Sequence, residues 1–549
     1  MALNQLVQTH LRSVGALASR IGRLGTAPRV ETLQLVPKDI RTADPSFARE
    51  LAHGQMGLAG RVVDLAGQSP FKLATGDTAW TADLMAFDWL RHLAATGDVE
   101  DRVRARLLCL EFLAARPDGI AWRLDVAGRR LMTWLSHAAC LIDGADERFY
   151  ATFMRAVADT MDELDRRCRS GEGTPERITA AAAVALAALV LDSRPAQRER
   201  AEQALVTELK SQIRADGGHV TRNAALVLEL LVDLLPLRAC YIASGLPPPE
   251  TLVHSIENMT AFLRHMRLGD GSLARFNGTG RVDADLMATI EAVAPARPGA
   301  ASEIGPSGYA RLERGTSIVL VDCASPALAS GMSTAGTLAF EMTVAGARLV
   351  CNGGWARGDD PGLRAMARAT ASHSTLTLAA SSSSEPDKRI GWTSASPLSG
   401  PVNVRGALAD RDGGIELTCE HDGYVARHGL LHKRRLTLSV DGSRLDVEDR
   451  LAGPGGTVRL ERDLPFAVHV HLDADADAAT TLSGDAVTIT LASGETWRLA
   501  VQGARASPEP SRDFAHVLGP VPTRQIVLRG STAGDTTVTW SLERVAVEG

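Results

Sequence analysis

The spacing of apolar residues changes once along the chain, near residue 296, and this change constrains the fold more than any other feature. From about residue 80 to 295, apolar residues recur every three or four positions, as in ERITAAAAVALAALVL. This spacing predicts amphipathic and buried helices. Beyond residue 296 they alternate with polar residues, as in LHKRRLTLSV, which predicts strands of antiparallel sheets. We therefore expect a multidomain α+β protein with its helices first.

The domain boundaries follow from the same change of spacing. Short breaks such as RPDG, RADGG and SGLPPPE separate the helices, which predicts helical hairpins in a bundle or a closed ring. The segment PARPGAASEIGPSG, rich in proline and small residues, marks the boundary. We expect a helical or flexible segment over 1–50, a helical domain over 51–298 and a β-sandwich or stacked sheets over 299–549. Within residues 1–30, an amphipathic helix is predicted.

Length, charge and cysteine spacing exclude several classes of protein. A chain of 549 residues is too long for one ordinary core. Its longest strongly apolar stretch, 178–191, is too short to span a bilayer, so no integral membrane segment is expected. A net charge of −6 argues against nucleic acid as a partner. Scattered cysteines and the lack of a signal-peptide pattern favour the cytoplasm, with the periplasm as the alternative. The oligomeric state is left open, with a homodimer as one option.

The first candidate site is DGGHVTRNAALVLELL, which begins at residue 216. A spacing of three and four residues predicts that His219, Arg222 and Asn223 lie on one face at the start of a helix. Free N–H groups at a helix N-terminus favour anions, so this face could hold a carboxylate or a sugar acid. The alternative is an N-terminal capping arrangement on a solvated face.

Three further segments carry candidate residues. His373 follows an arginine-rich loop with Arg368 and could accept or donate a proton near neutral pH; the alternative is an ordinary exposed histidine. The stretch EHDGYVARHGLLHKRRL, with Tyr424 and Arg434, predicts a positive patch for an acidic ligand, or a charged hairpin without one. His469 and His471 share a strand face and could form half of a metal site, but two ligands are too few to require a metal.

In these segments the chain resembles the heparinase II/III-like proteins, a group of polysaccharide lyases, over roughly residues 50 to 520. The segments that carry the resemblance are DGGHVTRN, LGDGSLARFNG, ARATASHSTLTL, HDGYVARHGLLHKRRL and VHVHL. The resemblance implies an incomplete α/α toroid followed by stacked antiparallel sheets. It also implies β-elimination of an acidic poly- or oligosaccharide that contains uronic acid.

The resemblance also implies roles for individual residues. Asn223 or His219 would neutralise the substrate carboxylate, His373 would be the base and Tyr424 the acid. The predicted substrate-binding residues are Arg222, Arg368, Asn277 and Arg434. No cofactor is required, although a divalent metal is an option.

The chain departs from the family pattern in two places. Phe276 and Asn277 stand where a toroid tyrosine is usual, and Thr375 stands where zinc-containing relatives have a second histidine. A relative with reduced catalysis, which binds an acidic glycan or cell-envelope precursor, is therefore the alternative function.

Overall fold

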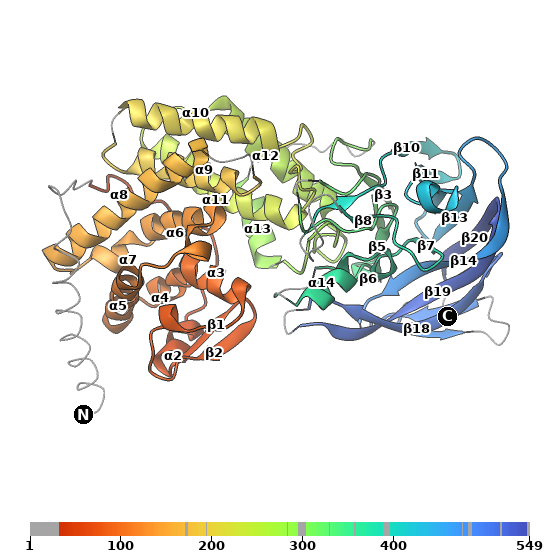
Figure 1. Ribbon diagram of the computed structural model, residues 1–549, viewed down its shortest axis with the longest axis horizontal. Coiled ribbons are helices and arrows are strands. Elements are labelled where there is room, and N and C mark those ends of the chain that lie inside the picture. Colours follow the sequence, from red (N-terminus) through yellow and green to blue (C-terminus); the bar gives the residue numbers. More distant parts are fainter. Residues whose placement is uncertain are drawn as a thin grey trace. The chain divides into compact units, whose positions relative to one another are not determined.

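The computed structural model divides the chain into two compact units (Figure 1). It describes residues 32–170, 174–193, 195–282, 284–294, 303–328, 330–355, 358, 360–387, 396–474, 476–480, 486–516 and 519–545. The amphipathic helix predicted within residues 1–30 lies outside these ranges. Unit 1 comprises Met1–Ser211 and Leu230–His254, and unit 2 comprises Gln212–Glu229 and Ser255–Gly549. Two segments that precede residue 298 thus belong to the same unit as the sheets.

Unit 1 is built from helices, as the three-and-four spacing predicts. In chain order its helices are α2 (Ser46–Ala52), α3 (Thr78–Ala86), α4 (Leu90–Thr96), α5 (Val99–Ala115), α6 (Leu124–Ser136), α7 (Ala138–Ile142), α8 (Glu147–Ser170), α9 (Arg177–Val190) and α10 (Pro195–Gln212). Helices α11 (Ala224–Ala243) and α12 (Glu250–Met266) contribute residues to both units. A short hairpin of β1 (Gln55–Leu58) and β2 (Arg61–Asp64) was not expected from the sequence.

Helix α9 is the centre of unit 1. Every residue from Ile178 to Val190 is buried. Its alanines allow close approach of α6, where a Cβ atom at Gly128 would lie only 3.1 Å from the Thr179 carbonyl oxygen. The apolar stretch therefore serves helix packing. Within the described ranges, no helix combines the length and apolar character needed to cross a bilayer.

Unit 2 contains two large antiparallel sheets, as the alternation predicts (Figure 1). The first has the order β10 (Val404–Arg411), β11 (Gly414–His421), β12 (Leu431–Ser439), β13 (Arg444–Ala452), β20 (Thr536–Arg544), β17 (Thr496–Gln502), β16 (Ala486–Thr490), β15 (Asp477–Thr480). The second has the order β18 (Arg505–Asp513), β19 (Val521–Gly534), β14 (Arg459–Leu472), β6 (Ala347–Cys351), β5 (Phe340–Val344), β4 (Ser317–Asp322), β3 (Tyr309–Arg314), and β7 (Leu376–Leu378) also pairs with β14. Smaller elements are α13 (Ala284–Val293), α14 (Pro361–Arg368), α15 (Val425–His428) and the pair β8 (Glu385–Pro386) and β9 (Leu398–Ser399).

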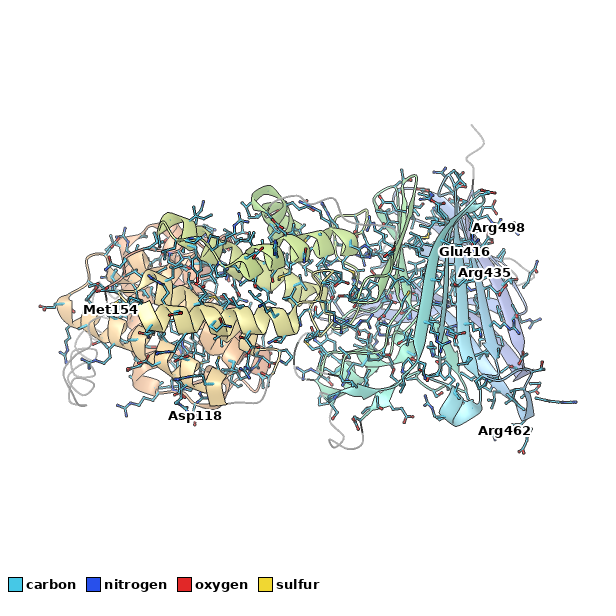
Figure 2. The ribbon with its side chains drawn as sticks, turned by 90° about the horizontal axis from the view of Figure 1, so that it is seen from above. Asp118, Met154, Glu416, Arg435, Arg462 and Arg498 are labelled. Atoms are coloured by element: carbon cyan, nitrogen blue, oxygen red, sulfur yellow. The ribbon has the colours of Figure 1, made fainter. Side chains whose placement is uncertain are left out.

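Strand β12 shows how alternation separates the core from the surface. Leu436 and Leu438 are fully buried in the apolar core that the two large sheets share. Thr437 lies between them and is half-buried, and Arg435 is exposed on the outer face, next to the strand that carries Glu416 (Figure 2). The apolar and polar residues that alternate along the sequence therefore face, in turn, the core and the outer surface of the sheet.

Neighbouring positions on β12 give a direct test of this arrangement. Leu436→Ala should lower the free energy of unfolding by about 2–5 kcal/mol, because it removes apolar contacts from the shared core. Thr437→Ala, one position along, should change it by about 0.5 kcal/mol or less. Urea denaturation of the full chain measures both. Equal losses in the two variants would contradict the assigned faces of the strand.

Candidate functional site

Residues 213–223 form an irregular loop before α11 rather than its first turns. Ile213 and His219 pair as an isolated antiparallel bridge, and Arg222 has a positive φ of 63°. The helix therefore begins only at Ala224. The prediction that His219, Arg222 and Asn223 share one helical face is wrong, because these backbone conformations are not helical.

Asn223 caps helix α11 through its side chain. Its Oδ1 accepts hydrogen bonds from the Ala225 and Leu226 backbone N–H groups, at 2.9 and 3.3 Å, and from the Thr279 hydroxyl at 3.2 Å. This cap fixes the orientation of the amide. The Nδ2 group consequently points toward Met332, whose sulfur lies 4.0 Å away. Asn223 thus presents N–H donors that meet only a weak acceptor in the described structure.

His219 is fully buried, with both ring nitrogens hydrogen-bonded. Nε2 donates to the Gln212 side-chain oxygen and Nδ1 accepts from the Thr221 hydroxyl, each at 2.8 Å. Burial, with a smaller contribution from Arg214, lowers the pKa of His219 to about 4. His219 is therefore a neutral residue that holds the loop in place.

Arg222 and Asn277 join the loop to the start of the sheets. The Arg222 guanidinium pairs with Asp322, donates to the Ser307 and Ser325 carbonyl oxygens at 2.9 Å each, and lies over the Tyr309 ring. The Asn277 Nδ2 group donates to Asp322 and to the Tyr309 hydroxyl, at 2.9 Å each. Both predicted substrate-binding residues are buried and already engaged in hydrogen bonds. Asp322 and Tyr309, which complete this cluster, were not among the predicted site residues.

His373 lies just before β7 and is fully buried. Its Nε2 group donates to the Ala367 carbonyl oxygen at 3.2 Å. Its Nδ1 atom has no hydrogen-bond partner among the described residues. Burial lowers the pKa of His373 to about 4. The imidazole is therefore neutral near pH 7, with an uncommitted lone pair on Nδ1.

The loop of residues 330–338 lies between Asn223 and His373. At one end Met332 contacts the Asn223 amide, and at the other a Cβ atom placed on Gly336 would lie 3.2 Å from the His373 Nδ1 atom. The structure therefore brings Asn223 and His373 to one loop. Met332 and Gly336 were missed because neither residue type signals chemistry in a sequence.

Two buried arginines hold this loop. Arg368 donates to the Ser333 carbonyl oxygen at 2.9 Å, and burial lowers its pKa to about 10. Arg434 donates to the Leu338 and Ser374 carbonyl oxygens, both at 2.8 Å. These side chains, predicted to bind substrate, instead bind backbone carbonyl oxygens of this loop, and Arg434 also binds that of Ser374, which follows His373.

Tyr424 belongs to the core between the large sheets. Its hydroxyl donates to the Leu376 carbonyl oxygen at 2.7 Å, and the residue is fully buried. Burial raises the pKa of Tyr424 well above its usual value. The structure therefore places this predicted acid in an apolar environment, where its hydroxyl proton is already donated to a backbone carbonyl oxygen.

A chain of hydrogen bonds fixes the tautomers of two more buried histidines. The Asp449 carboxylate accepts from His432 Nε2 at 2.7 Å, and His432 Nδ1 in turn accepts from His421 Nε2 at 3.2 Å. His421 Nδ1 accepts from the Gly423 backbone N–H at 3.0 Å. Burial would raise the pKa of Asp449, but Arg434 and His432 hold it well below its usual range. Both histidines are consequently neutral.

The predicted positive patch around Tyr424 is not one surface. On β12, Arg434 points into the core while Lys433 and Arg435 lie on the outer face. Lys433 pairs with Glu420 and Arg435 pairs with Glu448, each at 2.7 Å. The prediction of a single patch is wrong, because neighbouring residues of a strand face opposite sides.

His469 and His471 share one face of β14, as predicted, with ring centroids 6.1 Å apart. Both nitrogens of each ring are hydrogen-bonded: His469 to Gln525 and Thr377, His471 to Ser511 and the Ala371 carbonyl oxygen. Over the residues that the structure describes, no three His, Cys, Asp or Glu side chains are grouped so as to hold a metal ion. The geometry thus gives no support to a metal site here.

Comparisons with known proteins identify relatives of both the sequence and the fold. Residues 296–541 match the family model "Heparinase II/III-like, C-terminal". FtsZ-localized protein C of Caulobacter vibrioides is 31% identical over 532 residues, which cover 94% of this chain and 91% of that protein. The crystal structure of heparinase III has a TM-score of 0.72 at 14% identity, with 98% of this chain and 90% of that chain covered. A mutant of heparan sulfate lyase HepC from Pedobacter heparinus has a TM-score of 0.63 at 16% identity, with 99% and 89% covered. These structures show the fold predicted here, an α-toroid followed by antiparallel sheets.

The buried histidines predict how stability depends on pH. A histidine with a folded-state pKa near 4 binds fewer protons than in the unfolded chain, so stability is lost as the pH falls from about 6.5 toward 4. His219→Gln keeps a donor for Gln212 and removes one such group. The loss of unfolding free energy between pH 7 and pH 5 should shrink by about 2 kcal/mol. Urea denaturation at both pH values measures this, and an unchanged loss would show that His219 is protonated in the folded state.

Proposed function

The chain belongs to the heparinase II/III-like family, and from this premise we propose that it cleaves a uronic-acid-containing polysaccharide by β-elimination. The observation that carries the proposal is the uncommitted Nδ1 atom of His373. Six histidines are buried in the described part of the chain, and five of them, His219, His421, His432, His469 and His471, have both ring nitrogens hydrogen-bonded. His373 is the one member of this set with a ring nitrogen, Nδ1, that has no hydrogen-bond partner among the described residues.

His373 has the properties of a base for this reaction. The proton to be removed is on C5 of the uronate, next to the carboxylate, and removal requires a neutral acceptor within hydrogen-bond reach. Because burial lowers the pKa of His373 to about 4, the base form is present throughout the neutral range. A substrate carboxylate nearby would raise this pKa and strengthen the base.

Asn223 supports the second requirement, which is to offset the charge that develops on the substrate carboxylate. Its Oδ1 is committed to the helix cap, so its N–H donors have a fixed direction. Fixed donors stabilise developing charge without reorganising during the reaction. Met332, about one-third exposed at 36%, covers these donors and would have to turn aside for a substrate. Methionine is suited to this because its side chain is flexible.

The leaving oxygen also needs a proton, and the geometry does not favour Tyr424 as its source. That hydroxyl is buried and donates to Leu376. In a syn elimination one group can serve both steps. His373 takes the C5 proton, the C5–H electron pair forms the C4–C5 double bond, the C4–O bond breaks, and the imidazolium returns the proton to the leaving oxygen. His373 is therefore proposed as both base and acid.

The second candidate function is binding of an acidic glycan or a cell-envelope precursor without cleavage. Three of the four tyrosine hydroxyls are engaged: Tyr241 with Glu202, Tyr309 with the Arg222 carbonyl oxygen and Tyr424 with Leu376. None of these three can protonate a leaving group without losing its partner. The relative from Caulobacter vibrioides is, moreover, named for its localisation with FtsZ rather than for a reaction. These two observations favour a relative that has kept the fold for binding.

A lyase assay separates the two candidates. Wild-type protein incubated with heparan sulfate, chondroitin or alginate should produce the ultraviolet absorbance of an unsaturated uronate. His373→Gln should lower the rate by about 10²–10⁴-fold, because the base is lost. His53→Ala, an exposed position in unit 1, is the control and should keep the full rate. Binding of these polysaccharides without any unsaturated product would reject cleavage and leave the second candidate.

Asn223 offers a variant that separates its two roles. Asn223→Asp keeps an N-cap oxygen for α11 but replaces the N–H donors with a negative charge. The unfolding free energy should change by about 0.5 kcal/mol or less, because Asn and Asp cap helices about equally well. Glycan cleavage, or glycan binding if no cleavage occurs, should fall at least about tenfold. Asn223→Ala should lose both stability and activity. An Asn223→Asp protein with normal activity would remove Asn223 from the site.

A further inference from the structure

Thr334 carries a second uncommitted polar atom beside His373. The residue is 4% exposed, and its hydroxyl has no hydrogen-bond partner in the described part of the chain. A buried hydroxyl without a partner is costly, so such groups in native structures call for an explanation. Two of them, Thr334 Oγ1 and His373 Nδ1, occur here together.

Gly336 lies against both atoms. A Cβ atom on Gly336 would lie 3.2 Å from His373 Nδ1 and 3.3 Å from Thr334 Oγ1. Both atoms therefore border the same face of Gly336. The φ angle of Gly336 is not positive, so the backbone conformation does not itself require glycine. The absence of a side chain is needed because the imidazole and the hydroxyl occupy that face.

Hydrogen bonds fix the backbone around Thr334, and they therefore define where its side chain begins. The Thr334 N–H donates to the Asn277 side-chain oxygen at 3.4 Å, and the Ala335 N–H donates to the Arg368 carbonyl oxygen at 2.9 Å. The Ala335 carbonyl oxygen accepts from the Thr370 hydroxyl at 2.7 Å. The backbone groups named here are paired, whereas the Thr334 hydroxyl has no hydrogen-bond partner in the described part of the chain.

We propose that Thr334 is a further catalytic residue, whose hydroxyl donates a hydrogen bond to the leaving glycosidic oxygen. This inference rests on the proposed β-elimination. In a uronate the C5 proton and the C4 oxygen are on adjacent carbons, so a syn elimination needs a base and a donor side by side. His373 Nδ1 and Thr334 Oγ1 are such a pair.

The proton balance follows from the chemistry of the two groups. His373 Nδ1 takes the C5 proton and the C5–H electron pair forms the C4–C5 double bond as the C4–O bond breaks. Thr334 offsets the negative charge on the departing oxygen through its O–H, which it keeps. The protonated His373 then supplies the proton that this oxygen retains. A threonine hydroxyl is too weak an acid to give up its own proton, but it can stabilise the charge as an oxyanion-hole donor does.

Four variants and two substrates test the proposal. Thr334→Val keeps the shape and removes the hydroxyl, and should lower kcat on a polysaccharide about 100-fold with little change in KM. Thr334→Ser keeps a hydroxyl and should stay within about fivefold of wild type. Gly336→Ala places a methyl group against both atoms and should lose activity as Thr334→Val does.

The second substrate is a synthetic uronate with a nitrophenyl ether at C4. Its phenolate leaves without help, so Thr334→Val should cleave it nearly as fast as wild type, whereas His373→Gln should not. Equal losses on both substrates would indicate a structural role and overturn the proposal, as would full activity of Thr334→Val on the polysaccharide. A wild-type protein that cleaves neither substrate would instead reject the proposed β-elimination itself, and the role of Thr334 with it.

Discussion

The arrangement of the site in unit 2 depends on one buried carboxylate, Asp449. Removing a carboxylate from water costs several kcal/mol, and this cost is offset only if its oxygens are well paired. Here Arg434 binds both oxygens, and His432 and the Trp540 indole N–H add two more hydrogen bonds. With its fork fixed in this way, Arg434 has one nitrogen left, which binds Leu338 and Ser374. The ion pair thus positions the last residue of the loop, Leu338, and the residue that follows His373. Loss of either partner would leave a buried charge, at a cost of about 3–5 kcal/mol.

The buried histidines differ in whether both of their ring nitrogens are hydrogen-bonded. Among the described residues, five of the six buried histidines are fixed structural groups, since each of their ring nitrogens has a partner. His373 is held by its backbone and by Nε2, so its Nδ1 atom can stay uncommitted without the ring losing its orientation. A base needs this combination of a fixed ring and an available lone pair. In the proposed reaction, the hydrogen bonds that engage the ring nitrogens of the other buried histidines leave His373 Nδ1 as the available base.

The sequence predicted the architecture well because apolar spacing reports burial directly, as α9 and β12 show. It also selected His373 and Asn223, which the structure brings to one loop. It was wrong about the helical face at His219 and Arg222, because the positive φ of Arg222 depends on a long-range pairing with Asp322 that no local pattern reveals. It interpreted Arg368 and Arg434 as substrate-binding because a cation that binds backbone and one that binds a ligand look alike in a sequence. Thr334 and Gly336 could not be found, since their significance lies only in what surrounds them.

Because the Tyr309 and Tyr424 hydroxyls of unit 2 already donate to backbone carbonyl oxygens, the proposed reaction uses a histidine rather than a tyrosine as its acid. Tyrosine as an acid must release a proton with a reference pKa near 10, whereas an imidazolium formed during the reaction releases its proton far more readily. A single histidine can therefore carry the proton from C5 to the leaving oxygen if a hydroxyl stabilises the negative charge on that oxygen until the proton arrives. Such a site would depend on the substrate's own carboxylate to raise the pKa of His373 from about 4 toward the neutral range. Neutral sugars lack that charge, so the same burial that keeps His373 unprotonated would also restrict catalysis to acidic glycans.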